Sequence, residues 1–351
     1  MPPSLPSSAQ DRLLVFAPHP DDETIATGGL IQSALRAGAR VEVLFATDGD
    51  NNPWPQRWLE RRWRVDADAR TRWGARRRAE ALAALDRLAV AGHAAEPQFL
   101  GWPDQGLTER LMDHPRAIDA LRDRITAFAP SHVAMPALED AHPDHSALHV
   151  MAELALLQAG LRCVRLAYCV HGASSPDALE VASAEPVRAC KRAAMEAYAS
   201  QLALSRNRLV ALAERAETFE ASVAGSAAIE GNPASITMAF ETPRVRFARR
   251  ELLLVLATRT SVLRFRHVLA PTSVAARMLL RDSDGHAIEA DWDGRALTFE
   301  LPQFARPLLS AWAKCDRGHP RLVVYDRERW ARAPGRTRAS APAMPAVLGH
   351  P

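Results

Sequence analysis

Residues 13–23, with the sequence LLVFAPHPDDE, are the stretch that decides the fold. They open with a short apolar run, which is typical of a buried strand, and a helix-like pattern follows them. The turn between these elements carries His19 and, after one proline, the acidic side chains of residues 21–23. Such a concentration of carboxylates is costly unless an opposite charge compensates it. A divalent metal is the simplest compensator, so the stretch favours a metal at a strand-to-helix turn.

The composition is that of a globular protein. Of the 351 residues, 48% are hydrophobic and 24% are charged, and no apolar run of about 18 residues predicts a transmembrane helix. Residues 1–10 lack the basic and apolar regions of a secretory signal. The net charge of +3 does not by itself indicate nucleic acid. The four cysteines form no C-x-x-C pair, so we expect reduced thiols and a cytoplasmic location.

Strand-like and helix-like segments alternate along the first half of the chain. Strands are expected at 12–17, 41–47, 97–101, 132–136 and 163–170, and helices at 24–37, 75–91, 115–128, 146–159, 186–201 and 207–219. The first strand, helix and strand span about 30 residues, the length of a right-handed βαβ unit. This alternation predicts an α/β fold with a doubly wound, mostly parallel sheet.

The pattern changes from about residue 240. Strand-like runs are expected at 252–256, 276–280, 296–300 and 321–325, and Asp-Gly turn signals separate some of them. We therefore divide the chain into an α/β domain over 1–235, a C-terminal β-rich appendage of unknown role over 240–330, and a tail over 331–351. The tail is rich in Ala, Pro, Arg and Ser, which predicts disorder.

A second group of polar residues, 139–145, follows the fourth expected strand. Ligands of an open α/β sheet bind at the carboxyl ends of the strands, and the first and fourth strands are neighbours in a common doubly wound order. The two loops then offer His19, Asp22 and His145, a set of nitrogen and oxygen donors that fits a catalytic zinc site. Asp21, beside a ligand, is the candidate base for a water activated by the metal.

Other residues near these loops receive supporting or structural assignments. His142 is the candidate group that stabilises an oxyanion and protonates an amine leaving group, and Asp144 is a candidate to orient a histidine. Glu23 is expected to support the helix start. His171 is assigned a structural role. The Gly28-Gly29 pair is not part of a G-x-G-x-x-G sequence, so it does not predict nicotinamide binding.

The sequence APHPDDE at 17–23, together with AHPDH at 141–145, resembles the motif pair of the PIG-L/LmbE-like de-N-acetylases. The resemblance extends over roughly residues 12–205. It implies a Zn-dependent enzyme of Rossmann-like fold that removes acyl groups, usually acetyl, from N-acylated amino sugars such as N-acetylglucosamine. By this resemblance His19, Asp22 and His145 are the metal ligands. Asp21 is then the general base and His142 the oxyanion-stabilising acid. Another divalent metal, such as Fe²⁺, is an alternative to zinc.

Three weaker matches bear on the substrate. Arg77 with Glu80 resembles a family R-x-x-E helix whose arginine faces the substrate. The loop 99–107 resembles a family loop with an aspartate near the sugar, which here is Asp104. Residues 198–201 resemble a late family helix that ends in Ser-Gln.

The segment 54–78 combines tryptophans with arginines, and two interpretations of it stay open. It is either a solvated amphipathic helix whose tryptophans pack on the core, or a substrate lid. In a lid, indoles such as Trp54 stack on sugars and guanidiniums bind phosphates or carboxylates. Trp102 is a further candidate for substrate contact.

A lid would suit a small-molecule amino sugar, including a lipid-linked or nucleotide-linked one. Nucleic acid is not an expected partner, because no recognised binding module accompanies the arginines. Two other functions remain possible on this sequence. One is an amidase acting on a non-sugar conjugate, such as a thiol conjugate or a natural product. The other is a non-catalytic glycan-binding protein. The sequence indicates no oligomeric state.

Overall fold

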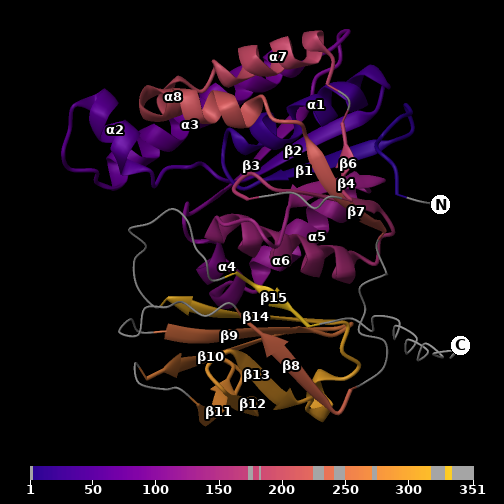
Figure 1. The fold of residues 1–351 in the computed structure, drawn as a ribbon, viewed down its shortest axis with the longest axis vertical. Coiled ribbons are helices and arrows are strands. Elements are labelled where there is room, and N and C mark those ends of the chain that lie inside the picture. The colour runs from indigo at the N-terminus through magenta and orange to yellow at the C-terminus, as the bar shows by residue number, and fades with distance from the viewer. Residues whose placement is uncertain are drawn as a thin grey trace, which may run out of the picture.

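The computed structural model describes residues 3–172, 177–181, 183–223, 233–240, 250–270, 275–317 and 329–333. They form two β-sheets with one layer of helices between them and another on the outer side of the first sheet (Figure 1). The α/β part contains β1 (Arg12–Ala17), α1 (Asp22–Arg36), β2 (Arg40–Thr47), α2 (Pro53–Glu60), α3 (Ala67–Leu88), β3 (Glu96–Trp102), α4 (Leu107–Asp113), α5 (Arg116–Phe128), β4 (His132–Pro136), α6 (Pro143–Ala159), β5 (Val164–Tyr168), β6 (Leu179–Glu180), α7 (Glu185–Met195), α8 (Ala199–Ala213) and β7 (Thr218–Val223). The C-terminal part contains β8 (Ser235–Ala239), β9 (Arg250–Ala257), β10 (Val262–Leu269), β11 (Ala276–Arg281), β12 (Ala287–Trp292), β13 (Ala296–Glu300), the 3₁₀ turn η1 (Gln303–Ala305), β14 (Ser310–Arg317) and β15 (Ala331–Arg332).

The first sheet has the strand order β3-β2-β1-β4-β5-β7-β6. The strands from β3 to β5 pair in parallel, and β7 and β6 are antiparallel. β1 lies inside the sheet, with Leu13 and Val15 packed on one face and Leu14 and Phe16 on the other. Burial on both faces is expected of a parallel strand covered by helices on both sides. The predicted doubly wound, mostly parallel sheet is confirmed, and β1 and β4 are neighbours as predicted.

Helices cover both faces of this sheet. α1, α3, α7 and α8 pack on one face, and α4, α5 and α6 pack on the other (Figure 1). Among the residues that the structure describes, no helix is both long and apolar enough to span a membrane.

Four helix predictions need correction. The helix expected at 75–91 is α3, which begins at Ala67 and ends at Leu88. α6 begins at Pro143, three residues before the expected start, because a proline is favourable in the first turn of a helix and His142 caps it. The expected helices at 186–201 and 207–219 are instead α7 and α8, which meet near Tyr198. Tyr198 has non-helical φ and ψ of −82° and 52°, and its buried hydroxyl donates a hydrogen bond to Glu23. Residues 218 and 219 belong to β7.

The second sheet is antiparallel, with the order β15-β14-β9-β10-β11-β12-β13-β8. β9 alternates between two cores: Leu253 and Val255 pack with the residues of α5 and α6, whereas Leu252 and Leu254 pack inside the second sheet. The β-rich part therefore shares a hydrophobic core with the helix layer of the α/β part. This finding confirms the expected C-terminal β-rich sheet.

Some details of this sheet were not predicted. β8, β10, β12, β14 and β15 were not expected. β12 alternates buried and exposed residues, which is the pattern of a half-buried strand. The expected strand at 321–325 lies outside the described residues. In the tail that was expected to be disordered, Ala331 and Arg332 instead form β15, which pairs with β14, and residues 334–351 lie outside the described residues. The division of the chain at 235 and 240 into separate domains stays a prediction.

A buried ion pair joins α7 to α1 at the Gly28-Gly29 pair. Lys191 Nζ lies 2.7 Å from Glu217 Oε1, and the same carboxylate accepts hydrogen bonds from the backbone N–H groups of Gly29 and Leu30 at 2.7 and 2.9 Å. A Cβ atom on Gly29 would lie 3.1 Å from Glu217 Oε2. The two glycines therefore make room for an ion pair rather than for a phosphate.

We expect Glu217→Gln to lower the free energy of unfolding by about 3 kcal/mol, because it leaves the Lys191 ammonium buried without its counter-charge. The measurement is a urea unfolding curve. Glu185→Gln is the control, since Glu185 makes an exposed pair with Arg188, and we expect it to leave the unfolding midpoint essentially unchanged. Equal midpoints for both variants would show that the buried pair does not stabilise the fold.

Candidate metal centre

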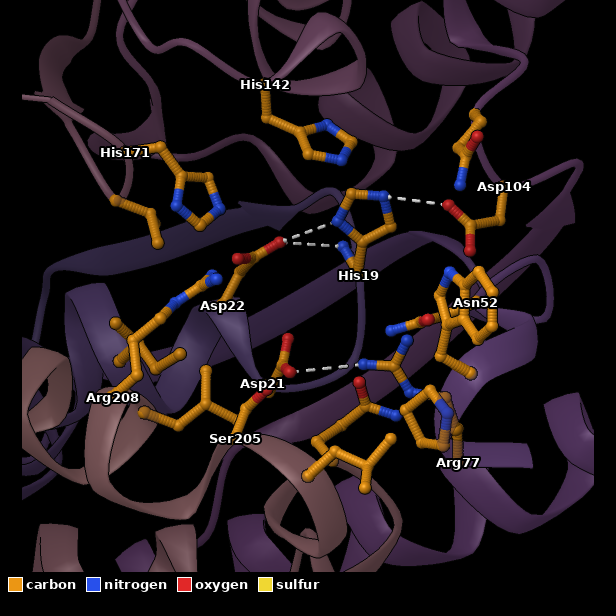
Figure 2. Close-up of a pocket in the computed structure, with 18 residues that line it drawn as sticks. His19, Asp21, Asp22, Asn52, Arg77, Asp104, His142, His171, Ser205 and Arg208 are labelled. Atoms are coloured by element: carbon orange, nitrogen blue, oxygen red, sulfur yellow. Dashed lines mark hydrogen bonds and ion pairs between the residues drawn. The ribbon is translucent and has the colours of Figure 1, made fainter. Parts of the chain in front are cut away.

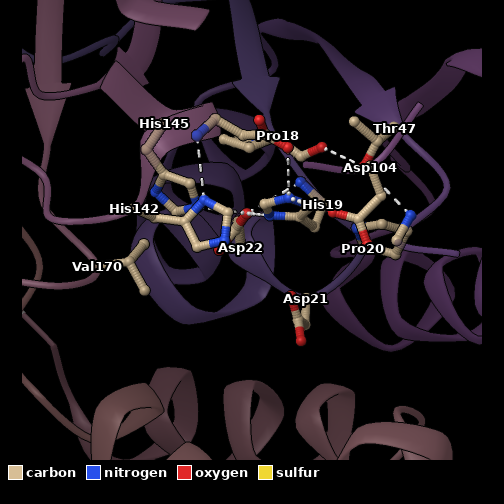
Figure 3. Close-up of polar contacts among 12 residues, drawn as sticks. Pro18, His19, Pro20, Asp21, Asp22, Thr47, Asp104, His142, His145 and Val170 are labelled. Carbon is tan, nitrogen blue, oxygen red and sulfur yellow. Dashed lines mark hydrogen bonds and ion pairs between the residues drawn. The ribbon is translucent and has the colours of Figure 1, made fainter. Parts of the chain in front are cut away.

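Two loops meet at the carboxyl ends of β1 and β4. His19 lies in the turn from β1 into α1, and Asp22 is the first residue of α1. His142 caps α6, and His145 lies in the first turn of that helix (Figure 3). All four side chains are buried. Because β1 and β4 are paired in parallel, their ends lie at the same edge of the sheet. The structure therefore brings together the residues predicted as metal ligands.

Asp22 lies at the centre of the donor set. Its Oδ2 atom is 3.1 Å from His19 Nδ1 and 3.2 Å from His145 Nε2. Two groups of donors overlap at His145. One consists of His19, His142 and His145, and the other of Asp22, His145 and His171. Within each group the donor atoms lie within 4.8 Å of one another. Zinc and similar divalent cations prefer imidazole nitrogens and carboxylate oxygens as ligands, and this buried cluster contains both.

The state of His145 supports this fit to a cation. Both of its ring nitrogens are buried, and neither makes a hydrogen bond of acceptable geometry with any described residue. Nevertheless, carboxylates of Asp22 and Asp140 lie 3.2 and 3.1 Å away. One anionic group therefore faces each of the two ring nitrogens of His145. The residues present therefore fit a divalent metal.

The electrostatics of the cluster follow from these neighbours. Burial acts to raise the pKa of Asp22, but His145 and His19 outweigh it and hold that pKa well below its usual range. Burial, followed by the charges of His19 and His145, lowers the pKa of His142 well below its usual value. Asp22 is therefore an anion and His142 is neutral.

The tautomer of His142 follows from its role at the start of α6. Its Nδ1 atom accepts a hydrogen bond from the backbone N–H of Asp144 at 3.2 Å. A neutral imidazole that accepts at one nitrogen carries its proton on the other. The proton of His142 is therefore assigned to Nε2, and the ring lines the pocket described below.

Asp21 lies apart from the row formed by His19, Asp22, His142 and His145 (Figure 3). Its carboxylate is 3.2 Å from the Arg77 guanidinium (Figure 2). Burial raises the pKa of Asp21 to about 7 against the opposing effect of Arg77. The residue has φ of 120°, a conformation that L-residues rarely adopt and that is typical of functional sites.

Arg77 is held by the backbone around it. It donates hydrogen bonds to the carbonyl oxygen of Gly49, at 3.0 Å, and to that of Pro20. Gly49 has φ of +61°, and a Cβ there would lie 1.8 Å from the guanidinium, so only glycine fits. Three residues later on the same helix, Glu80 accepts hydrogen bonds from the backbone N–H and the hydroxyl of Ser200. The R-x-x-E and Ser-Gln matches therefore meet in space.

Two carboxylates position the histidines. Asp140 Oδ2 faces His145 Nδ1 and also accepts a hydrogen bond from the N–H of Val170 at 2.8 Å. Asp144 Oδ2 lies 3.4 Å from His19 Nε2 and accepts from the N–H of Gln105 at 2.6 Å. Asp144 thus joins the loop after β3 to the metal centre. A third carboxylate, Asp104, lies 3.1 Å from His19 Nε2.

A cavity of about 270 Å³ opens beside the cluster. His19, Asp21, Arg77 and Asp104 line one side, and Ser205 and Arg208 of α8 line the opposite side (Figure 2). Trp54, Asn52, Gln201 and Leu204 are also lining residues. Charged groups thus surround a cavity of the size that takes part of a small ligand.

Two outcomes differ from the sequence analysis. Trp102 does not line this cavity; it packs against the core group of α4, α5 and α6, with the Arg110 guanidinium 5.7 Å from its ring centre. Its role in substrate contact therefore stays a prediction without support from the geometry. His171, assigned a structural role, is instead a lining residue with its ring 5.2 Å from that of His145. Its position just after β5 is the signal that identifies it, since β5 ends at the same edge as β1 and β4.

Comparisons with known proteins agree with the motif pair. Residues 14–156 match the model of the PIG-L family, described as GlcNAc-PI de-N-acetylase, which confirms the resemblance to that family. A 1D-myo-inositol 2-acetamido-2-deoxy-alpha-D-glucopyranoside deacetylase of Tsukamurella paurometabola is 34% identical over 171 residues, covering 41% of this chain and 54% of that protein. The protein of the same name from Gordonia bronchialis is 36% identical over 162 residues, covering 41% and 56%. The chain thus spans about half the length of these relatives.

Solved structures that the chain matches include a deacetylase triple mutant from the teicoplanin biosynthetic pathway. It has 25% identity and a TM-score of 0.45, and the alignment covers 61% of this chain and 99% of that one. The N,N'-diacetylchitobiose deacetylase of Pyrococcus horikoshii has 18% identity and a TM-score of 0.42, with coverage of 60% and 84%.

Proposed function

Because residues 14–156 match the GlcNAc-PI de-N-acetylase family, we propose that this protein is a metal-dependent hydrolase that removes an N-acyl group, acetyl above all, from an amino sugar or glycoconjugate. The observation that carries the proposal is the buried set of His19, Asp22 and His145 with Asp21 beside it in an open cavity. The named relatives, which are deacetylases of an N-acetylated sugar linked to inositol, support the same activity.

We propose His19, Asp22 and His145 as the residues that hold the metal, and zinc as the metal, with Fe²⁺ as the alternative. The metal, when bound, supplies Lewis-acid polarisation of the acyl carbonyl and makes water a stronger nucleophile near neutral pH. Asp140 and Asp144 act by positioning: each carboxylate lies next to the ring of a proposed ligand, His145 and His19 respectively.

Asp21 is proposed to accept the proton of the attacking water. It lines the cavity, and its pKa of about 7 suits a base that works near neutral pH. Arg77 holds the Asp21 carboxylate in place through the 3.2 Å ion pair. His142 is proposed to stabilise the oxyanion by donating a hydrogen bond from its Nε2–H. The proton that Asp21 takes from the water is proposed to pass to the leaving amine, because neutral His142 would become an imidazolate if it gave up its only N–H. The breaking bond is the amide C–N bond, and the products are a carboxylic acid and a free amine.

The substrate is proposed to be a small amino sugar that is part of a larger conjugate. Trp54 and Arg77 line the cavity together with Asp104, so an indole face, a guanidinium and a carboxylate are all available to a sugar ring and its substituents. An anionic linkage to a lipid or a nucleotide would suit Arg208, which also lines the cavity. The spacing of the four cysteines supports a cytoplasmic enzyme.

The test is acetate release from a panel of N-acetylglucosamine conjugates, including inositol-linked and phosphate-bearing ones, with metal content measured on the same sample. We expect release by the metal-loaded protein and its loss after treatment with a chelator. Release that persists in metal-free protein would contradict the proposal. If only non-sugar N-acyl conjugates are turned over, the protein is an amidase for another substrate class. If a sugar conjugate binds tightly but no acetate is released, the protein is a glycan-binding protein.

A further inference from the structure

The largest exposed apolar side chains gather in one part of the structure. Trp54, Trp58 and Trp63 are 62%, 66% and 79% exposed, and Leu59 between them is 37% exposed. They lie on α2 and on the loop that joins α2 to α3. By contrast, Trp73, Trp292, Trp312 and Trp330 are all buried. Three indoles in contact with water within ten residues form an exposed apolar patch, which marks an interaction site.

This patch continues to the mouth of the proposed active site. α2 packs against α8, and Leu204 of α8 is itself 49% exposed. Trp54 and Leu204 both line the cavity that contains Asp21 and His19. In Figure 1, α2 projects at one end of the outer helix layer, next to α3 and α8. A partner seated on the patch would therefore lie at the entrance of the cavity.

Positive charge is interleaved with the tryptophans. The Arg57 guanidinium lies 5.1 Å from the ring centre of Trp54 and 5.4 Å from that of Trp63. Arg61, Arg62 and Arg64 are exposed in the following loop. Two of the three nearby acids have partners: Glu60 faces Arg72 at 3.6 Å, and Asp66 caps α3. The third, Asp68, is exposed in the first turn of α3. The surface therefore combines apolar and cationic groups with few free acids.

We propose that this Trp/Arg surface, made of Trp54, Arg57, Trp58, Leu59, Arg61, Arg62, Trp63 and Arg64, docks on an anionic phospholipid bilayer. Tryptophans favour the interface between water and lipid, and arginines are attracted to anionic head groups. A short amphipathic helix with indoles among arginines binds in the plane of such an interface.

The side chains favour a bilayer over nucleic acid as the occupant. Indoles and guanidiniums serve either partner, because both stack on bases and bind phosphates. Leu59 and Leu204, however, are exposed aliphatic groups next to the indoles, and aliphatic groups gain from acyl chains rather than from a stacked, hydrated strand. An anionic bilayer therefore accounts for the indoles, the guanidiniums and the aliphatic side chains of this surface.

Docking would place the mouth of the cavity at the level of the lipid head groups. The docking itself does not depend on the activity and can be tested without it.

The experiment is co-sedimentation of the full chain with vesicles of phosphatidylcholine alone and with vesicles that also contain phosphatidylglycerol. We expect sedimentation with the anionic vesicles, a blue shift of tryptophan fluorescence, and weakening by added salt. The combined variant Arg61→Gln, Arg62→Gln and Arg64→Gln should reduce partitioning by about tenfold or more. The variant Trp58→Ser with Trp63→Ser should also reduce it.

Matched controls remove the same kinds of group elsewhere. Arg116→Gln with Arg281→Gln and Arg295→Gln removes three exposed arginines far from α2, and Phe304→Ser removes an exposed ring of the C-terminal part. These controls should bind as the parent does. Unchanged thermal unfolding shows that each variant is folded, and unchanged acetate release from a water-soluble conjugate separates loss of docking from loss of the active site.

Three results would overturn the proposal. The first is no sedimentation with anionic vesicles. The second is vesicle binding that neither the arginine variant nor the tryptophan variant of the Trp/Arg surface weakens. The third is retention on single-stranded RNA that is stronger than on vesicles and is lost in the same variants, which would assign the surface to nucleic acid instead.

Discussion

Asp21→Asn is expected to lower kcat for deacetylation by about 10²–10⁴-fold while leaving the metal content unchanged. The factor is that of losing a positioned general base. The carboxylate lies in the cavity against Arg77 and outside the row of proposed ligands, so its loss should affect proton transfer and not metal binding. Asparagine is the suitable replacement because it keeps the size of the side chain and tolerates positive φ, and Asp21 has φ of 120°. The measurements are steady-state acetate release and metal analysis of the same preparation.

Asp48→Asn is the matched control. Asp48 pairs with Arg78, the neighbour of Arg77 on α3, at 2.7 Å, and it is not a lining residue of the cavity. We expect its kcat to stay within a few-fold of the parent, since a partly exposed pair contributes little. If Asp21→Asn keeps most of the parental kcat, or loses its metal, Asp21 is not the base.

The meeting of the two metal-binding loops could be predicted because it follows from strand order. An apolar run before His19 and another before residues 139–145 identify two strands, and the ends of neighbouring parallel strands share one edge. β1 and β4 are such neighbours. The same rule applied to β5 would have included His171, but a single histidine without an adjacent acidic motif gives a weak signal.

Other features could not be predicted because they depend on long-range packing. Asp140 contacts His145 and the backbone of Val170 only after β4 and β5 pair. Trp102 is partly buried and packs against the core group that includes residues of α4, α5 and α6, and α6 lies far from it in the sequence. The run at 252–256 predicts a strand, yet its alternating residues face two different cores. A continuous apolar run indicates burial on both faces but does not identify what covers them.

Segment 54–78 contains both buried and exposed tryptophans, which the sequence alone could not separate. The sequence does not distinguish core tryptophans from exposed ones, because both occur at helical spacing. In the structure Trp73 is buried, whereas Trp54, Trp58 and Trp63 are exposed. Each interpretation therefore applies to part of the segment: α3 packs its tryptophan on the core, and α2 presents its own to solvent at the cavity mouth.

His145→Gln is expected to abolish deacetylation together with metal binding. His145 is fully buried between Asp22 and Asp140. The glutamine that replaces it has no imidazole nitrogen, so the donor set of His19, Asp22 and His145 becomes incomplete. The metal affinity should fall by at least about 100-fold, since removal of even an outer partner of a ligand costs 10- to 100-fold. The measurements are metal content after dialysis and acetate release with and without added zinc.

The control is His149→Gln, one turn further along α6. His149 is also buried, but its Nδ1 atom lies 2.8 Å from the carbonyl oxygen of Pro136 and it is not among the clustered donors. It should keep its metal and most of its activity. His145 and His149 are both buried on α6 and differ in whether they belong to the donor set. Equal loss of metal in both variants would therefore indicate damage to α6 and not a missing ligand. A His145→Gln protein that retains its full metal after dialysis would exclude His145 as a ligand.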